Sequence, residues 1–199
     1  VDMDMVFTEE QRLLADSARE FLTERCSTVA LRRLRAARDP LGYEPEAWRQ
    51  MVELGWTAIP FPESIVAVDL GYRGRGAVFE QMGRTLAASP LLSSVVLGGS
   101  ALLLGGSPEQ RAAHIPAIIR GELRLVLAVD EGRHHDPAAI SLAARRAGDS
   151  WLLDGDKVFV IDGHGADGLV VAARSAGCAG GHAGITLFLV DAGAPGVEV

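Results

Sequence analysis

Two short segments carry most of the residue types that could do chemistry. The first follows an apolar run at residues 125–129 and reads DEGRHHD over residues 130–136. Carboxylates and histidines could transfer protons or bind a metal ion. His134 and His135 are adjacent, which is poor spacing for one ion without a third ligand from elsewhere. We therefore predict a solvated turn and no metal ligand here.

The second segment is residues 151–174, which read WLLDGDKVFVIDGHGADGLVVAAR. Phe159 offers an aromatic face on which a planar ring could stack. Val160 and Ile161 follow it, and neither side chain can donate a hydrogen bond. We expect His164 to lie in a loop because glycines flank it on both sides.

Two common classes of site are not supported. The motif Gly-x-Ser-x-Gly, which forms the turn that carries the nucleophilic serine of the α/β-hydrolases, does not occur. A hydrolase with a Ser-His-Asp triad of that kind is therefore not supported. Residues 71–76 read GYRGRG, which departs from the Gly-x-Gly-x-x-Gly dinucleotide fingerprint and follows no strong strand.

The first part of the chain is predicted to be helical. Thr8 and Gln11 have the spacing of a capping box, which predicts a helix over residues 9–25. Further helices are expected over residues 30–37, from Pro45, over residues 75–86, from about residue 91, and from Ser107. Pro116 should kink or divide the last of these, and Gly121 should end it. The loop that precedes the fourth helix reads PESIVAVDLGYRG.

After residue 122 the period changes to short β-prone runs separated by Gly and Asp turns. They lie at residues 125–129, 140–144, 151–153, 158–161, 169–173 and 185–190. Asp154 and Gly155 are a hairpin signal between two of these runs. The sequence thus predicts an α+β fold: an all-α domain over residues 1–122 and a small antiparallel β-barrel or sandwich over residues 123–199.

Composition excludes several classes of protein. The net charge of −7 argues against general nucleic-acid binding, which needs clustered basic residues. The longest apolar stretch, residues 90–106, is interrupted by serine and glycine, so we predict buried helices and no membrane span. No signal peptide is visible at the start of the sequence, and Cys26 and Cys178 lie far apart. A reducing cytoplasm is the expected location.

The whole chain resembles the acyl-CoA dehydrogenase family in the order of its segments. The segments on which this resemblance rests are TEEQRLLADSAREFL, PESIVAVDLGYRG, SPEQRAAHIPAIIRGE, LAVDE and residues 151–174. The resemblance implies FAD as cofactor, an acyl-CoA thioester as substrate and a 2-enoyl-CoA as product. It also implies an electron-transfer partner for the reduced flavin and a homo- or hetero-oligomer.

The resemblance further implies a carboxy-terminal four-helix bundle that carries the catalytic glutamate. By this analogy the chain ends at Val199 inside an incomplete β domain, so we expect the bundle to be absent. No catalytic residue is assigned.

The family pattern places the cofactor against two segments of this chain. The implied FAD-binding residues are Leu127, Val129, Asp130, His135, Asp136, Phe159, Val160 and Ile161. Asp130 stands where the family has a threonine hydroxyl, and a like charge at about 4 Å costs roughly 4 kcal/mol at an effective dielectric of about 20. A carboxylate there would oppose flavin reduction unless it is protonated or paired with Arg133 or a histidine. Ile161 replaces a threonine or serine, and residues 65–67 replace a glycine pair.

Two other functions stay open. The altered contacts at Asp130 and Ile161 also suit a non-catalytic dehydrogenase-like subunit that supports a catalytic homologue in a heteromer. An acyl-thioester binding module without redox chemistry is the third interpretation.

Overall fold

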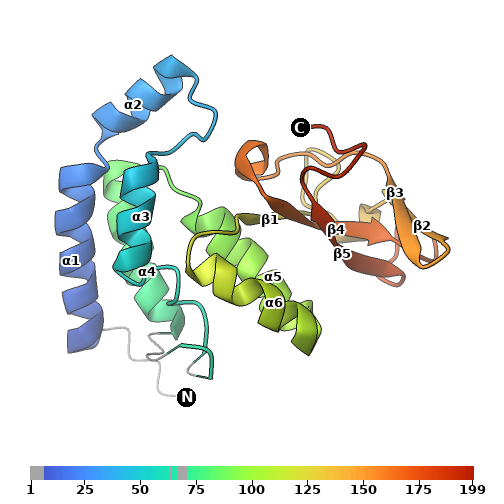
Figure 1. The fold of residues 1–199 in the computed structure, drawn as a ribbon, viewed down its shortest axis with the longest axis horizontal. Coiled ribbons are helices and arrows are strands. Elements are labelled where there is room, and N and C mark those ends of the chain that lie inside the picture. The colour runs from blue at the N-terminus through green and yellow to red at the C-terminus, as the bar shows by residue number, and fades with distance from the viewer. Residues whose placement is uncertain (1–6, 63, 67–70) are drawn as a thin grey trace.

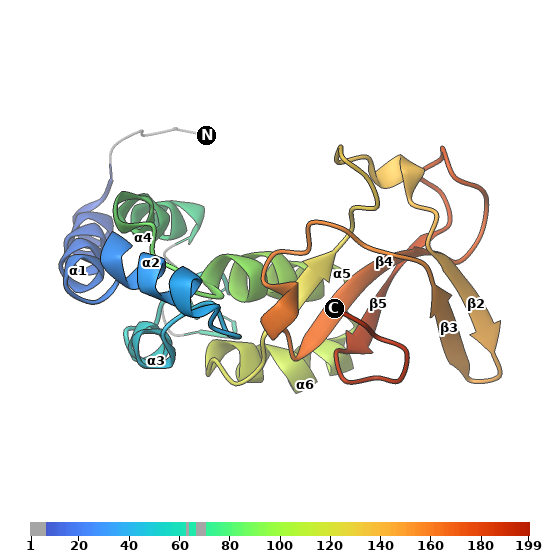
Figure 2. The ribbon, with the colours of Figure 1, turned by 90° about the horizontal axis from the view of Figure 1, so that it is seen from above.

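The structure, a computed structural model, describes residues 7–62, 64–66 and 71–199. The helices occupy one end of the molecule and the strands the other, with α5 and α6 between them (Figures 1 and 2). This arrangement confirms the α+β fold predicted from the change of period. Ala67, in the loop that departs from the family, lies outside the described residues.

The first four helices are α1 (Glu9–Arg25), α2 (Thr28–Ala37), α3 (Pro45–Glu53) and α4 (Gly71–Thr85). The capping box predicted for α1 is present: the Thr8 hydroxyl accepts from the Gln11 N–H at 3.2 Å, and the Gln11 side chain accepts from the Thr8 N–H at 3.1 Å. α1 packs against α4 and buries Ala18 and Leu22 completely. Gly55 follows α3 with φ +76°, as a left-handed helix end requires.

The next helical region begins as a π-helix. η1 (Leu91–Gly98) continues directly into α5 (Gly99–Gly105), and α6 (Pro108–Ile119) starts at a second capping box formed by Ser107 and Gln110. Of the two outcomes expected for Pro116, division of the helix does not occur, because α6 runs unbroken to Ile119. Pro116 lies within the last turn, where the proline removes only one intrahelical hydrogen bond. Gly121 ends the helical part with φ +70°.

The β part is one mixed sheet. Its strands are β1 (Leu125–Ala128), β2 (Ala143–Ala147), β3 (Ser150–Asp154), β4 (Gly168–Arg174) and β5 (Ile185–Asp191). β4 is the central strand: it pairs parallel with β1 and β2 and antiparallel with β5. The prediction of a purely antiparallel β domain is therefore wrong. The helix-like turns η2 (Pro137–Ala139) and η3 (Gly163–Gly165) lie in the long connections that let parallel strands meet.

The hairpin predicted at Asp154 and Gly155, between residues 151–153 and 158–161, does not form; the hairpin of the structure joins β2 to β3. β2 and β3 are joined by Gly148 and Asp149, and Ala147 pairs with Ser150. Gly148 has φ +65°, the conformation that a type II′ turn needs at its first position. Asp154 and Gly155 instead end β3, and residues 158–161 form no strand because Phe159 has φ +53°.

The two faces of the sheet meet different partners. Leu125 and Val170 belong to the core of the helical part, whereas Val126 and Val171 belong to a separate cluster on the other face. This is the alternation of a strand. β4 is buried along its whole length because both of its faces are covered.

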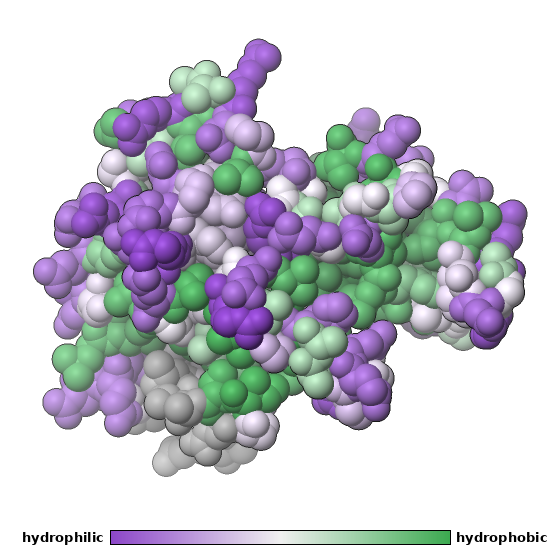
Figure 3. Space-filling view, viewed as in Figure 1, coloured by the Kyte–Doolittle hydropathy of each residue, from purple (hydrophilic) through white to green (hydrophobic). Residues whose placement is uncertain are grey.

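Part of the outer face of the sheet, the face that carries Val126 and Val171, is left uncovered. Hydrophobic side chains gather over the β part (Figure 3). A hollow of about 670 Å³ lies on this face, and Leu142, Leu169 and Val197 are among the residues that line it. The sheet does not close into a barrel.

Candidate functional site

A loop that we call the junction loop, residues 156–162, lies between the end of β1 and the helical part. The Val158 N–H donates to the Asp130 carbonyl at 2.8 Å. The Lys157 ammonium donates to the Val129 carbonyl at 2.9 Å and to Glu131 at 2.7 Å. These contacts hold the junction loop on the end of β1, so the two segments singled out in the sequence lie side by side.

Glu131 is the anchor of this arrangement. Besides Lys157, it accepts from the Ser141 N–H and hydroxyl, both at 2.7 Å, and from the Leu142 N–H at 3.0 Å. Burial raises the pKa of Glu131, but these hydrogen bonds, led by that from Lys157, outweigh burial and lower the pKa to about 2. Glu131 is therefore an ionised structural group and not a proton donor near neutral pH.

The junction loop presents apolar side chains outward. Phe159 is 73% exposed and Ile161 is 46% exposed, whereas Val160 is half-buried and packs on the outer cluster of the sheet. Among the described residues, no group accepts a hydrogen bond from the backbone N–H of Phe159, Val160 or Ile161. An exposed aromatic ring next to free N–H donors is suited to a planar ligand with polar edges.

β1 and the acidic turn after it carry the other residues predicted for the cofactor. Leu127 and Val129 are half-buried in or beside β1, while His135 and Asp136 are exposed. The Asp130 carboxylate lies 2.8 Å from Nδ1 of His135. Of the two partners predicted for Asp130, the structure thus selects a histidine over Arg133. Asp136 caps η2 by accepting from the Ala138 N–H at 3.1 Å.

The helical part is fastened to the sheet by polar contacts that the sequence did not reveal. Arg124 binds both oxygens of Asp167, at 2.9 and 2.7 Å, and donates to the Tyr43 hydroxyl at 3.3 Å. The hydrogen bonds from Arg124 lower the pKa of Asp167. In η1, the buried Ser94 hydroxyl donates to the Leu123 carbonyl at 3.2 Å and accepts from the Leu125 N–H at 3.1 Å. The junction is held at several points.

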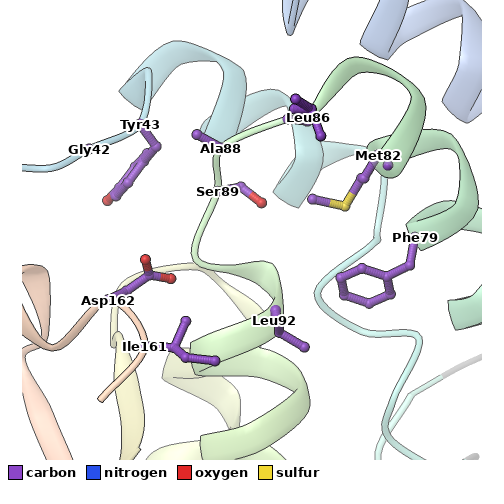
Figure 4. A pocket seen from close by; sticks show the side chains of 12 residues that line it. Gly42, Tyr43, Phe79, Met82, Leu86, Ala88, Ser89, Leu92, Ile161 and Asp162 are labelled. Carbon is purple, nitrogen blue, oxygen red and sulfur yellow. The ribbon is translucent and has the colours of Figure 1, made fainter. Parts of the chain in front are cut away.

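A pocket of about 370 Å³ opens at this junction (Figure 4). Its wall comes from the loop before α3, the end of α4, the start of η1 and the junction loop. The lining residues are Gly42, Tyr43, Phe79, Met82, Gly83, Leu86, Ala87, Ala88, Ser89, Leu92, Ile161 and Asp162. The size is that of a site for a small ligand or for part of a larger one.

Of the eight residues predicted for the cofactor, only Ile161 lines this pocket. Phe159 precedes Ile161 by two positions and is exposed, and the Asp130 carbonyl accepts from the Val158 N–H of the same loop. Asp162 and Tyr43 were missed as site residues. Asp162 follows an apolar run, which is a weak signal, and nothing in the local sequence marks Tyr43.

The structure thus consists of a helical part and a mixed sheet, with a pocket of about 370 Å³ where the two meet. Sequence models of two consecutive domains match this chain: the acyl-CoA dehydrogenase N-terminal domain at residues 8–122 and the acyl-CoA dehydrogenase middle domain at residues 128–199. The chain belongs to the acyl-CoA dehydrogenase family.

Relatives of known name agree with this assignment. A 3-(aryl)acrylate reductase of Clostridium sporogenes is 30% identical over 197 residues, which is 98% of this chain and 51% of that protein. The ChsE4-ChsE5 complex from Mycobacterium tuberculosis matches with a TM-score of 0.83 at 29% identity, covering 99% of this chain and 51% of that one. This chain spans about half the length of these two relatives.

A third likeness concerns the fold. A glutaryl-CoA dehydrogenase from Mycobacterium smegmatis, solved in complex with FADH2, matches with a TM-score of 0.80 at 22% identity and covers 98% of this chain and 48% of that one. Flavin therefore occurs in a protein that contains this fold. Among the described residues, no helix has the length and apolar character that a membrane span requires.

Proposed function

We propose that this chain is the amino-terminal and partial middle region of an FAD-dependent acyl-CoA dehydrogenase. The proposed reaction is the dehydrogenation of an acyl-CoA thioester between Cα and Cβ to the 2-enoyl-CoA. The observation that carries the proposal is the junction loop, which sets an exposed apolar face and free N–H groups beside a pocket of about 370 Å³. Family membership supplies the chemistry that such a site would support.

The residues of this edge fit a flavin in shape. Phe159 and Ile161 would cover an apolar ring face, and the N–H groups of residues 159–161 would donate to its polar edge. When bound, FAD would accept the hydride that leaves Cβ. Leu127, Val129, Asp130, His135, Asp136 and Val160 stay proposed as cofactor contacts from the family pattern.

Asp130 fits less well by charge alone, because a carboxylate near a reduced flavin is unfavourable. Its contact with His135 reduces that conflict whenever the imidazole is protonated. The Glu131–Lys157 pair acts by holding the loop, and the pocket would take the apolar part of the acyl group. No residue of this chain is proposed as the base that removes the Cα proton.

The test is the visible absorption spectrum of the purified full-length protein, followed by anaerobic titration with acyl-CoA thioesters. Flavin bands that bleach on addition of a thioester are the expected result. The variant Phe159→Ala should weaken flavin retention, whereas the control Leu152→Ala, which truncates an exposed residue of β3, should not. A flavin-containing protein that no acyl-CoA reduces would contradict the proposed reaction.

A second candidate is a non-catalytic subunit of a heteromeric dehydrogenase. The absence of a hydroxyl at Ile161 favours it, and the likeness to a solved complex of two different chains supports it. In that case the protein alone would contain no flavin, and flavin would be retained only after assembly with a catalytic homologue. Thioester binding without flavin in either state would favour the simple binding module.

A further inference from the structure

Asp162 places a carboxylate in the wall of a pocket that is otherwise mostly apolar. Phe79, Met82, Leu86, Leu92 and Ile161 are the large aliphatic and phenyl side chains that line this pocket. Figure 4 shows Asp162 on one side of the pocket and Phe79 and Met82 on the other. Asp162 is half-buried, so any ligand that fills the pocket would remove water from its carboxylate.

The position of this carboxylate is fixed from two directions. Asp162 has φ +56°, a left-handed conformation that aspartate tolerates better than most residues. Its Oδ2 accepts from the hydroxyl of Ser93 at 2.5 Å, and Ser93 is completely buried in η1. The junction loop is thereby tied to the π-helix, and the carboxylate cannot turn away without breaking that bond.

Only one oxygen of Asp162 is satisfied in this way. Among the described residues, no group donates to Oδ1, and Arg124, which lies in the same junction, is already bound to Asp167 and Tyr43. A hydrocarbon chain would leave Oδ1 dehydrated and unpaired, which is unfavourable. A ligand with a hydroxyl group would replace the lost water with a hydrogen bond.

We propose that Asp162 is a specificity-determining residue that selects an acyl group bearing a hydroxyl. The inference rests on the proposed function, because it takes this pocket as the site of the acyl group. Oδ1 accepts the hydrogen bond from the ligand hydroxyl while Oδ2 stays on Ser93. Sites built to pair with a hydroxyl discriminate strongly against analogues that lack it, since their own polar group is left unpaired.

The test measures binding of acyl-CoA thioesters to the full-length protein by calorimetry. Each probe is a straight-chain acyl-CoA of defined length, compared with the same thioester carrying a terminal hydroxyl. At the chain length that reaches Asp162, the hydroxylated probe should bind about tenfold more tightly or better. Equal affinities at every length would overturn the inference.

Two substitutions locate the effect. Asp162→Ala should abolish the preference for the hydroxylated probe, whereas Asp156→Ala, which removes an exposed aspartate of the same loop outside this pocket, should leave it intact. A preference that survives Asp162→Ala would refute the role of this carboxylate. If that variant does not fold, Asp162→Asn serves instead and should weaken the preference, because a neutral amide is the poorer acceptor.

The outcome also separates this inference from the proposed function. Binding of plain thioesters without any preference for a hydroxyl contradicts the role of Asp162 alone. Failure of every thioester to bind contradicts the proposed function, and the selectivity fails with it.

Discussion

The contribution of Glu131 to stability should depend on pH in a defined direction. Its carboxylate has an ordinary pKa of 4.5 and a pKa of about 2 in the folded chain. At about 1.4 kcal/mol for each pH unit, this difference corresponds to roughly 3 kcal/mol of folding free energy. Because the folded pKa is depressed, this contribution is complete above pH 4.5 and is lost as the pH falls toward 2.

The variant Glu131→Gln keeps the size of the side chain but removes the charge. Urea unfolding at pH 7 should show a loss of about 3 kcal/mol relative to the wild type, since Lys157 is then left as a buried cation without its partner. The difference should shrink steadily when the unfolding series is repeated from pH 5 toward pH 3.

Two controls sharpen this experiment. Glu20→Gln neutralises an exposed carboxylate of α1 and should leave stability nearly unchanged at each pH. The double variant Glu131→Gln with Lys157→Met should recover part of the loss, because it removes the unpaired cation. A loss for Glu131→Gln that is as large at pH 3 as at pH 7 would show that the carboxylate acts by packing and not by charge.

Three further changes test the helical part and the junction. Gly98→Ala should destabilise the protein by about 3 kcal/mol or more in thermal unfolding, because the new Cβ would lie 1.8 Å from the Leu125 carbonyl oxygen. The control Gly76→Ala, which has open space around its Cβ, should be neutral or slightly stabilising. Ser107→Ala should cost about 1 kcal/mol by removing the cap of α6, measured in the same way; an unchanged melting temperature would contradict that role. Arg124→Gln should cost about 1 kcal/mol and increase amide hydrogen exchange around Asp167, and unaltered exchange there would argue against the clamp.

The helices could be predicted because their signals are local. The capping boxes at Thr8 and Ser107 satisfy backbone groups within four residues, so the sequence contains both partners. Strand pairing depends on distant residues. Gly148 precedes Asp149 and Gly155 follows Asp154, so both pairs of residues could form a turn. Only the register of β2 against β3 decides that Gly148 makes the turn.

The candidate site also contains residues that the local sequence suggests and residues that only distant contacts bring together. Phe159 and Ile161 stay predictions made from residue type and order, and both side chains are exposed in the structure. Tyr43, Met82 and Asp162 reach one pocket from three segments far apart in the chain, and the contact of Asp162 with Ser93 spans 69 positions. Such contacts follow from how the two domains pack, which no local pattern encodes.

The central place of β4 also sets the order in which the β part can assemble on the ribosome. β1 leaves the ribosome well before its parallel neighbour, because 43 positions separate Arg124 from Asp167 at the start of that pairing. Until β4 follows, β1 and the hairpin of β2 and β3 have no strand to join them and present unpaired edges. The helical part is synthesised before β1, and β1 packs on η1 in the folded chain, so docking of β1 on η1 would cover one side of β1 before β4 is made.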